Sequence, residues 1–410
     1  MKVTLIHGRF RNSWESQALG LIGAYIKEHR PEVQLDFFHG TLDDDDTIVN
    51  GASNSDIVAF SSTSPSFAFV QTIATRLKAI RQKTHVVVGG YHPSAVKDRC
   101  LIDVVDQVVV GEGEDAMVRI IDGDRSAVVY GRPMAFHDLP WCDRDLIKNE
   151  RHIDVAYRDT GRRITSFQSH RGCPYRCRFC ADGKRKTMHS GIPVGVRHRN
   201  VHDLAAEIAA VTEKYSLDLV KFCDPTWNAK PGWVHQFCGA KRAMCSAVPF
   251  FANIHARCCT ADMFEDMANA GCTDIGIGVE SGSERVLESM GKGITKDDVR
   301  CAVRWAKAAG IKVRGYFILG MPCEGNRELE ETEAFADELD LDEYGFTILC
   351  PYPGTDFYDA TLSRVDWTDV DEYSNEFWRT NTLTNVELRA WQKRLADRFA
   401  STLTFRMQKM

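Results

Sequence analysis

Three cysteines lie close together near the middle of the chain, at Cys173, Cys177 and Cys180. This spacing allows one short loop to bring three thiolates to a single metal centre, and thiolates are the ligands that hold iron–sulfur clusters. A cubane of four irons normally takes four thiolates, but the next cysteine along the chain is Cys223. One iron therefore keeps an open position for a small molecule, and the spacing predicts a [4Fe-4S] cluster of this kind.

Other interpretations of these cysteines fit less well. A zinc site usually joins two cysteines to a second, more distant pair, and the sequence has no evident second pair. Cys177 and Cys180 alone have the spacing of a redox dithiol, but thioredoxin-like motifs occur in a different strand–helix context. Free cysteines often pack as small apolar residues, although Arg171, Arg176 and Arg178 argue against a core segment here. A cluster loop is the favoured interpretation.

The segment from Ser169 to Cys180, with Phe179 just before the last cysteine, resembles the cluster motif of the radical S-adenosylmethionine superfamily. The resemblance implies that the open iron binds the amino and carboxylate groups of S-adenosylmethionine. It further implies that an electron from the cluster cleaves this cofactor to a 5′-deoxyadenosyl radical. The expected partners are then a small-molecule substrate and an electron donor such as flavodoxin or ferredoxin.

The elements before this loop alternate between apolar runs and helical patterns over residues 1–125, which predicts an α/β domain with a doubly wound parallel sheet. Ligands of such sheets bind beyond the carboxyl ends of the strands, where Gly89, Gly90 and His92 are expected. The predicted strands are Val3–His7, Val33–Phe38, Ile57–Ser61, His85–Gly89 and Gln107–Val110.

Two segments of this domain, Gly89–Ser94 and Val108–Glu114, resemble the cobalamin-binding domain that precedes many radical S-adenosylmethionine enzymes. The resemblance implies cofactor contacts at Gly89, Gly90 and His92. Cobalamin domains that ligate cobalt with histidine carry Asp-x-His-x-x-Gly, and Asp36–Gly40 does not match this pattern. Two interpretations stay open: cobalamin bound without a histidine ligand, or an empty domain kept as a scaffold.

The remaining chain is predicted as a connector over 126–163, a barrel over 164–355 and a helical region over 356–410. In the connector, Ile153–Tyr157 and Ile164–Gln168 suit paired strands. The six strand–helix units that follow fit the partial (β/α)6 barrel of the superfamily, whose chemistry collects at the carboxyl ends of the strands. Helical periodicity over Asn385–Phe405 predicts a small cap over the barrel mouth. The expected barrel strands are Ile164–Gln168, Leu219–Asp224, Phe250–His255, Asp274–Val279, Val313–Leu319 and Gly345–Leu349.

The residues just after these strands are the candidates for chemistry. Asp224 is interpreted either as a cofactor contact or as a helix cap. Adjacent thiols on a strand face opposite sides, so one of Cys258 and Cys259 faces the barrel, either as an ordinary thiol or as a contact for a thiophilic substrate. Tyr316 is expected to point inward.

The segment Gly278–Gly282 matches the Gly-x-Glu-Ser-Gly segment of the superfamily. The resemblance implies that Glu280 contacts the ribose or amino end of S-adenosylmethionine, with Gly278 and Ser281 beside it. A carboxylate at this place can accept two charge-assisted hydrogen bonds.

Composition limits the other partners. The net charge of −6 argues against a nucleic-acid or membrane binder, and no apolar run approaches the roughly eighteen residues of a membrane span. The fourteen cysteines suggest reduced thiols and a cytoplasmic protein.

Together these features predict a radical S-adenosylmethionine enzyme, with methyl transfer from methylcobalamin to a carbon of a small molecule as the first interpretation. The alternatives are a cobalamin-independent rearrangement, cyclisation or aminocarboxypropyl transfer to arsenic or sulfur, a non-catalytic iron–sulfur or cobalamin sensor, and a structural zinc domain.

Overall fold

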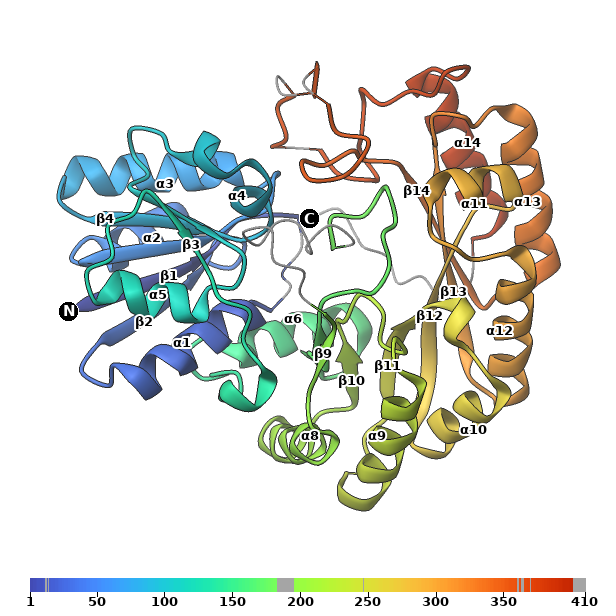
Figure 1. Cartoon of the computed structure of the whole chain (residues 1–410), viewed down its shortest axis with the longest axis horizontal. Coiled ribbons are helices and arrows are strands. Elements are labelled where there is room, and N and C mark those ends of the chain that lie inside the picture. Colours follow the sequence, from blue (N-terminus) through green and yellow to red (C-terminus); the bar gives the residue numbers. More distant parts are fainter. Residues whose placement is uncertain are drawn as a thin grey trace.

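Two parallel β-sheets, each with six strands, form the framework of the protein in the computed structural model (Figure 1). Strands of the first sheet such as Ile57–Ser61 are buried on both faces, which is the usual environment of parallel sheets. The structure describes residues 1–11, 13, 15–182, 195–245, 247–359, 361–362, 365–368 and 370–400.

The first sheet has the strand order β2-β1-β3-β4-β5-β6, with a separate apolar core on each face. Its helices lie on both faces, so the predicted doubly wound domain is confirmed. The last strand, β6, lies beyond residue 125 and extends the sheet into the segment predicted as a connector. The strands are β1 (Lys2–His7), β2 (Gln34–His39), β3 (Ile57–Ser61), β4 (His85–Gly89), β5 (Gln107–Val110) and β6 (Val128–Tyr130), and the helices are α1 (Gln17–His29), α2 (Asp45–Ala52), α3 (Phe67–Ile80), α4 (Tyr91–Val96) and α5 (Glu114–Ile121).

The connector contains a helix, α6 (Asn149–Thr160), where the sequence predicted a strand over Ile153–Tyr157. That prediction was wrong because the alternation of apolar residues over this short stretch imitates a strand. The buried residues Asn149, His152 and Ile153 instead share one helical face. The helix ends at Gly161, whose φ of 70° lets its N–H bond the carbonyl oxygen of Tyr157.

The second sheet has the order β14-β13-β12-β11-β10-β7 and forms the predicted partial barrel. Side-chain caps such as Thr295, which bonds the N–H of Asp298, start several of its helices. A short antiparallel pair, β8 (His170–Arg171) and β9 (Arg197–His198), lies beside the sheet. The barrel elements are β7 (Ile164–Phe167), α8 (Val201–Tyr215), β10 (Leu219–Phe222), α9 (Pro231–Met244), β11 (Phe250–Ile254), α10 (Ala261–Asn269), β12 (Cys272–Glu280), α11 (Glu284–Met290), α12 (Lys296–Ala308), β13 (Lys312–Leu319), α13 (Asn326–Leu339) and β14 (Glu343–Ile348).

The last helix, α14 (Asn385–Arg398), packs on the outside of the barrel beside β14 and does not cap the mouth as predicted. Leu388 and Leu395 are fully buried in the barrel core, and Gln392 donates to the carbonyl oxygen of Phe346 at 2.9 Å. An amphipathic helix beside an open sheet edge buries more apolar surface there than over a polar mouth. Residues 401–410, including the end of the predicted helix at Phe405, lie outside the described residues.

The segment before α14 crosses the end of the barrel instead. The indole N–H of Trp378 donates to the carbonyl oxygen of Gly320 at 2.6 Å. On the other side of the same segment, Asp371 accepts a hydrogen bond of 3.0 Å from Arg11, which follows β1. This segment therefore connects the barrel mouth to the first sheet, whose strands point toward the barrel (Figure 1).

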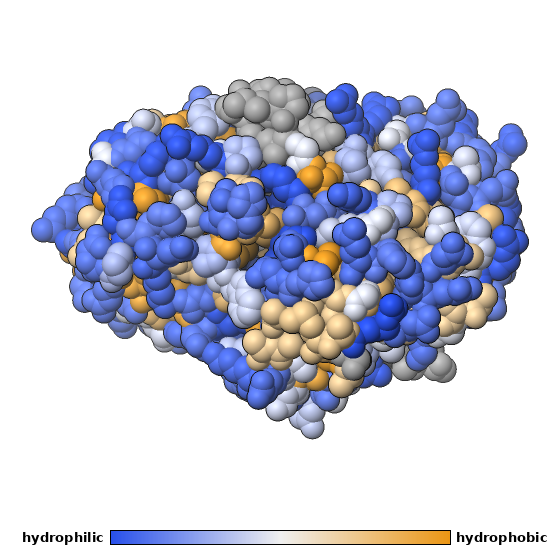
Figure 2. Space-filling view, turned by 60° about the horizontal axis from the view of Figure 1, so that its bottom comes forward, coloured by the Kyte–Doolittle hydropathy of each residue, from blue (hydrophilic) through white to orange (hydrophobic). Residues whose placement is uncertain are grey.

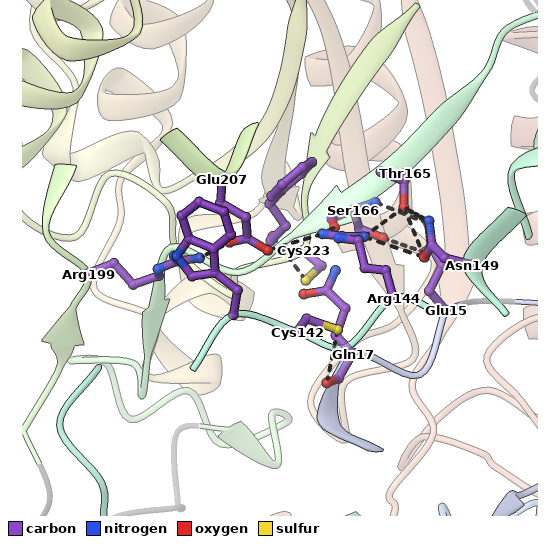
Figure 3. Close-up of polar contacts among 12 residues, drawn as sticks. Glu15, Gln17, Cys142, Arg144, Asn149, Thr165, Ser166, Arg199, Glu207 and Cys223 are labelled. Atoms are coloured by element: carbon purple, nitrogen blue, oxygen red, sulfur yellow. Dashed lines mark hydrogen bonds and ion pairs between the residues drawn. The ribbon is translucent and has the colours of Figure 1, made fainter. Parts of the chain in front are cut away.

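A buried polar network fixes the junction of the two domains (Figure 3). Glu15 accepts from the hydroxyl of Thr165 at 2.8 Å and from the backbone N–H of Ser166 at 3.1 Å. Arg144 of the connector donates to the carbonyl oxygen of Ser166 at 2.8 Å and lies 3.7 Å from Glu207 of α8. These bonds attach the first strand of the barrel to the loop that precedes α1.

The surface seen in Figure 2 is mostly hydrophilic, with small apolar areas between polar ones. Among the described helices, none combines the length and the apolar character needed to cross a membrane.

Candidate active site

The three cysteines lie on one loop that follows β8 at the end of the barrel. Gly172 opens the loop with a φ of 86°, a conformation that glycine adopts without strain. Cys173 and Cys177 are buried, and Cys180 is partly exposed. The backbone N–H of Cys180 donates to the carbonyl oxygen of Cys177 at 3.2 Å, which curls the loop around its sulfurs.

Asp224, which follows β10, holds the entry to this loop. Its carboxylate accepts hydrogen bonds from the backbone N–H of Ser169, at 2.9 and 3.1 Å, and from that of His170, at 3.0 Å. Asp224 is only 1% exposed. Its carboxylate thus binds the backbone that leads to Cys173. The sequence had predicted instead that Asp224 contacts a cofactor or caps a helix.

Arg171 fixes the same entry from the side of the first sheet. Its guanidinium donates to Glu114 at 2.6 Å and to Glu112 at 3.0 Å. Burial opposes the charge of Arg171, but Glu114 and Glu112 offset this and hold its pKa above the ordinary value. The two carboxylates follow β5, so the carboxyl edge of the first sheet is connected directly to the cysteine loop.

The chemistry of the loop fits a cluster. Burial raises the pKa of the Cys177 thiol to about 12, and the positive charge of Lys292 acts in the opposite direction. A metal must displace this proton, because thiols ligate as thiolates. Within the described part of the chain, no three His, Cys, Asp or Glu side chains gather closely enough to hold one metal ion. The ligands of a cubane bind different irons and therefore stand further apart than the ligands of one ion.

Glu280 and Lys292 form an ion pair beside the cysteine loop. Lys292 Nζ lies 2.5 Å from Glu280 Oε1 and 2.7 Å from the carbonyl oxygen of Gly278. A Cβ on Gly278 would lie 2.3 Å from Lys292 Nζ and 2.4 Å from Glu280 Oε1, so only glycine leaves room for the pair. The pairing of β12 with β13 shifts register between Gly278 and Glu280, and this bulge turns Glu280 toward the barrel end.

Ser281, predicted beside Glu280, is fully buried and anchors the turn after β12. Its hydroxyl lies 3.1 Å from the Thr332 hydroxyl of α13 and accepts from the N–H of Ser283 at 3.1 Å. These bonds position the backbone around Glu280 and leave the serine hydroxyl occupied.

Tyr175 and His255 form a stacked pair between the cysteine loop and the end of β11. Their rings are 3.7 Å apart and nearly parallel, at 3°. Among the described residues, neither ring nitrogen of His255 has a hydrogen-bond partner, and the side chain is buried. Burial and the nearby charge of Lys292 lower the pKa of His255 to about 3, so its ring is neutral.

The adjacent thiols Cys258 and Cys259 have different environments, as the sequence suggested. Cys259 belongs to the apolar core, and its sulfur bonds the carbonyl oxygen of His255 at 3.4 Å. The Cys258 sulfur lies 2.7 Å from the hydroxyl of Tyr175. Cys258 therefore contacts the cysteine loop, and the described contacts do not bring it together with Cys223.

The inside of the barrel carries polar and aromatic side chains. The ring of Tyr316 lies 2.7 Å from the position of a Cβ on Gly276 and 3.4 Å from that on Gly345, so it covers two neighbouring strands. Cys223, just after β10, is exposed, and desolvation by the surrounding protein raises the pKa of its thiol. Lys221 lies two residues before Cys223, on β10. Burial lowers its pKa to about 8.

The carboxyl edge of the first sheet is lined by small residues. Gly90 has a φ of 105°, and a Cβ there would lie 2.6 Å from the carbonyl oxygen of Ser62. Gly89, just before it, accepts from the N–H of Ser62 at 2.8 Å. His92 lies 2.9 Å from the hydroxyl of Ser64, and burial lowers its pKa to about 4. This edge fits a ligand that is held by backbone groups and hydroxyls.

His39, the only histidine of the segment that departs from the cobalt-ligating pattern, is fully buried. Its ring lies 4.5 Å from that of His7 and 4.8 Å from that of His152, and its Nδ1 accepts from the N–H of Thr41 at 3.2 Å. It packs inside the junction of the domains and is not presented to a ligand at the sheet edge.

No local pattern indicates Arg171 as an anchor, because its partners lie almost sixty residues away. Tyr175 and His255 could have been identified as candidates from the sequence. An aromatic residue inside the cysteine loop and a histidine at a strand end are both visible, but their stacking is a tertiary contact.

Comparisons with known proteins agree with this geometry. Residues 167–336 match the family model of the Radical SAM superfamily, and residues 3–121 match that of the B12 binding domain. An uncharacterized methyltransferase of Pyrococcus horikoshii is 27% identical over 334 residues, covering 75% of this chain and 70% of the relative. A bacteriochlorophyllide d C-12(1)-methyltransferase of Chlorobaculum tepidum is 25% identical over 346 residues, covering 81% of this chain and 72% of the relative.

Among solved structures, the fold resembles that of the radical S-adenosylmethionine methyltransferase TsrM from Kitasatospora setae with cobalamin and a [4Fe-4S] cluster bound. The TM-score is 0.69 with 14% sequence identity, over 87% of this chain and 76% of that chain. The first matched region covers most of the first sheet, the second covers most of the barrel sheet, and the cysteine loop lies in the second region.

Proposed function

Because this chain belongs to the radical S-adenosylmethionine superfamily and carries a B12 binding domain before its barrel, we propose that it is a cobalamin-dependent methyltransferase acting on a carbon of a small molecule. Both curated relatives described above are named as methyltransferases, which supports methyl transfer over the other radical reactions. The B12 binding match supports bound cobalamin over an empty scaffold.

Cys173, Cys177 and Cys180 are proposed to hold a [4Fe-4S] cluster. When bound, the cluster and S-adenosylmethionine supply an electron and a radical at the 5′ carbon of the nucleoside. The protein holds the cysteine loop in a fixed position. Asp224 does so by accepting from the backbone N–H of Ser169, and Arg171 by its ion pair with Glu114. A fixed loop limits the directions in which a radical can react, which is how geometry supplies selectivity.

Glu280, Lys292 and the backbone at Gly278 are proposed to bind the polar groups of S-adenosylmethionine. Glu280 offers a carboxylate to hydroxyl or ammonium donors, and Lys292 offers an ammonium to a carboxylate. Because the pair is buried, each of these charged hydrogen bonds is stronger than it would be in water. His255 stays neutral beside them, so it can accept or donate a hydrogen bond without adding charge.

The small-residue edge around Gly89, Gly90 and His92 is proposed to hold cobalamin without a histidine ligand, in agreement with the burial of His39. Cobalamin when bound supplies a transferable methyl group. The substrate is proposed to bind inside the barrel near Tyr316 and Cys223, between the two cofactors. The fourteen cysteines and an oxygen-sensitive cofactor favour a cytoplasmic location.

One observation carries this proposal. The backbone N–H of Arg178, which follows Cys177, donates to the carbonyl oxygen of Met290 at 2.9 Å, two positions before Lys292. This bond supports one shared site for the proposed cluster ligands and the proposed nucleotide pair, although 119 positions of sequence separate Cys173 from Lys292.

Anaerobic reconstitution with iron and sulfide, with and without cobalamin, tests the proposal. We expect a brown protein that releases 5′-deoxyadenosine or demethylated S-adenosylmethionine when it is reduced with dithionite. Cys177→Ala should lose both the iron and the cleavage, whereas Cys301→Ala, a partly exposed thiol on α12, should keep both. Cleavage of S-adenosylmethionine by the Cys177→Ala variant at the wild-type rate would contradict the proposal.

A further inference from the structure

One side of the cysteine loop faces solvent. Its exposed residues are Pro174, Arg176 and Arg178, whereas the neighbouring Cys173 and Cys177 are buried. The opposite side is covered, since Arg171 is buried against the carboxylates that follow β5. The surface around Arg176 is therefore a solvent-facing side of the loop, directly next to Cys177.

Arg257 joins these two arginines around the turn that follows α11. Arg178 donates to the carbonyl oxygen of Ser289 at 3.1 Å, and Arg257 lies 3.4 Å from the carbonyl oxygen of Gly293. Between them, a Cβ on Gly291 would lie 3.8 Å from the carbonyl oxygen of Arg176. Arg176, Arg178 and Arg257 thus form one basic surface on both sides of the turn, named here the arginine surface.

The charge of the arginine surface is poorly compensated. Most arginines of this chain have a carboxylate partner, but within the described ranges Arg176 and Arg257 form no ion pair with an acidic side chain, and Arg178 has Asp356 at 3.6 Å. Glu288 is the exposed acid next to the turn. The surface keeps a positive charge in a protein whose net charge is −6.

We propose that the arginine surface is the docking site for an acidic electron-transfer protein of the flavodoxin type. The proposal rests on the proposed function, which requires an electron at the cluster. Electron transfer weakens steeply with distance, and Arg176 immediately precedes the ligand Cys177 in the loop. The flavin hydroquinone would give up one electron to become a semiquinone, and the oxidised cluster would accept that electron. Complementary charges raise association rates and make them sensitive to salt.

The test compares Arg176→Glu/Arg257→Glu with Arg158→Glu/Arg304→Glu, which reverses two exposed arginines on α6 and α12 that also lack an acidic partner in the described chain. Binding of an acidic oxidised flavodoxin to each reconstituted protein is measured by calorimetry at low salt and in added NaCl. In parallel, S-adenosylmethionine cleavage is measured with photoreduced flavodoxin and with dithionite, which needs no docking site.

We expect the first variant to bind flavodoxin at least tenfold more weakly, to lose the salt dependence, and to lose flavodoxin-driven cleavage to the same degree. Its dithionite-driven cleavage and the binding of the control variant should stay within about twofold of wild type. Unchanged flavodoxin binding, or an equal loss with both reductants, would overturn the docking site. No cleavage by the wild-type protein with dithionite would instead reject the proposed function.

Discussion

Arg171 Nη2 lies 2.6 Å from Glu114 Oε1, and this ion pair joins the residue two positions before the first proposed cluster ligand to the first helix residue after β5. Arg171 and Glu114 are both buried. A buried ion pair holds its two segments in one arrangement because separating the charges leaves each without compensation. The proposed cobalamin edge and the cysteine loop therefore keep a fixed relation.

Removing the two carboxylates should loosen the loop. In Glu112→Gln/Glu114→Gln the buried guanidinium of Arg171 loses its countercharges, so the free energy of unfolding should fall by about 3 kcal/mol, and iron retention should fall with it. The matched control is Glu150→Gln, whose carboxylate pairs with Arg163 in a more exposed environment and should contribute less than about 1 kcal/mol. Urea unfolding and iron analysis measure both effects. Equal stability of the two variants would contradict the anchoring role.

Glu280→Gln should weaken the binding of S-adenosylmethionine about tenfold or more, because an amide cannot replace a charge-assisted acceptor. Iron content should not change, since Glu280 is not a proposed ligand. The control is Glu288→Gln on α11, whose side chain is exposed. Equilibrium dialysis with labelled S-adenosylmethionine measures the affinity. Wild-type affinity in Glu280→Gln would remove Glu280 from the nucleotide site.

Gly278→Ala should separate binding from folding. The new methyl group would collide with the ends of the flexible Lys292 and Glu280 side chains, which can move without disturbing the core. We therefore expect a loss of S-adenosylmethionine affinity with a melting temperature within a few degrees of wild type. Gly239→Ala in α9, where a Cβ meets nothing within 4 Å, is the control and should leave the affinity unchanged. A fully folded Gly278→Ala with normal affinity would show that the ion pair does not contact the nucleotide.

Acid should destabilise the junction of the domains. Burial and the neighbouring rings of His39 and His152 lower the pKa of His7 to about 3, and burial also lowers the pKa of His152. The unfolded chain takes up these protons near pH 6.5, so between that pH and about 3 it binds more protons than the folded chain, and stability falls as the pH falls.

His7→Asn removes one of these titrations. From pH 7 to pH 4, the free energy of unfolding of the wild type should fall more than that of the variant, by up to about 3 kcal/mol. Urea midpoints measured across this range test the difference. Parallel pH profiles of the two proteins would show that His7 does not stay neutral in the fold.

Local patterns were sufficient to predict five of the six strands of the first sheet, the six strands of the barrel sheet and the cysteine loop, but not β6. Runs such as His85–Gly89 and the spacing of Cys173, Cys177 and Cys180 are short-range signals, and parallel sheets bury such runs completely. The sequence analysis did not predict α6, because a few alternating apolar residues do not distinguish the period of a helix from that of a strand.

The site itself depends on contacts that no local pattern contains. Asp224 reaches back to the backbone at Ser169 and His170, more than fifty positions earlier in the chain. Tyr175 and His255 stack although 80 positions of sequence separate them, and they follow different strands. The sequence therefore predicts which residues are candidates for the site. Only the three-dimensional fold shows which of their side chains already bond or stack with other residues of the protein.

The backbone of Glu280 has a φ of 64°, in the left-handed region, and among the described non-glycine residues with such angles Glu280 alone is buried. A side chain in this conformation costs about 1 kcal/mol or more, which a glycine would recover. Replacing Glu280 would, however, leave the buried ammonium of Lys292 without its countercharge, and that loss outweighs the strain recovered. The strained residue of β12 is therefore held in place by its ion pair, and it supplies the carboxylate that is proposed to bind the nucleotide.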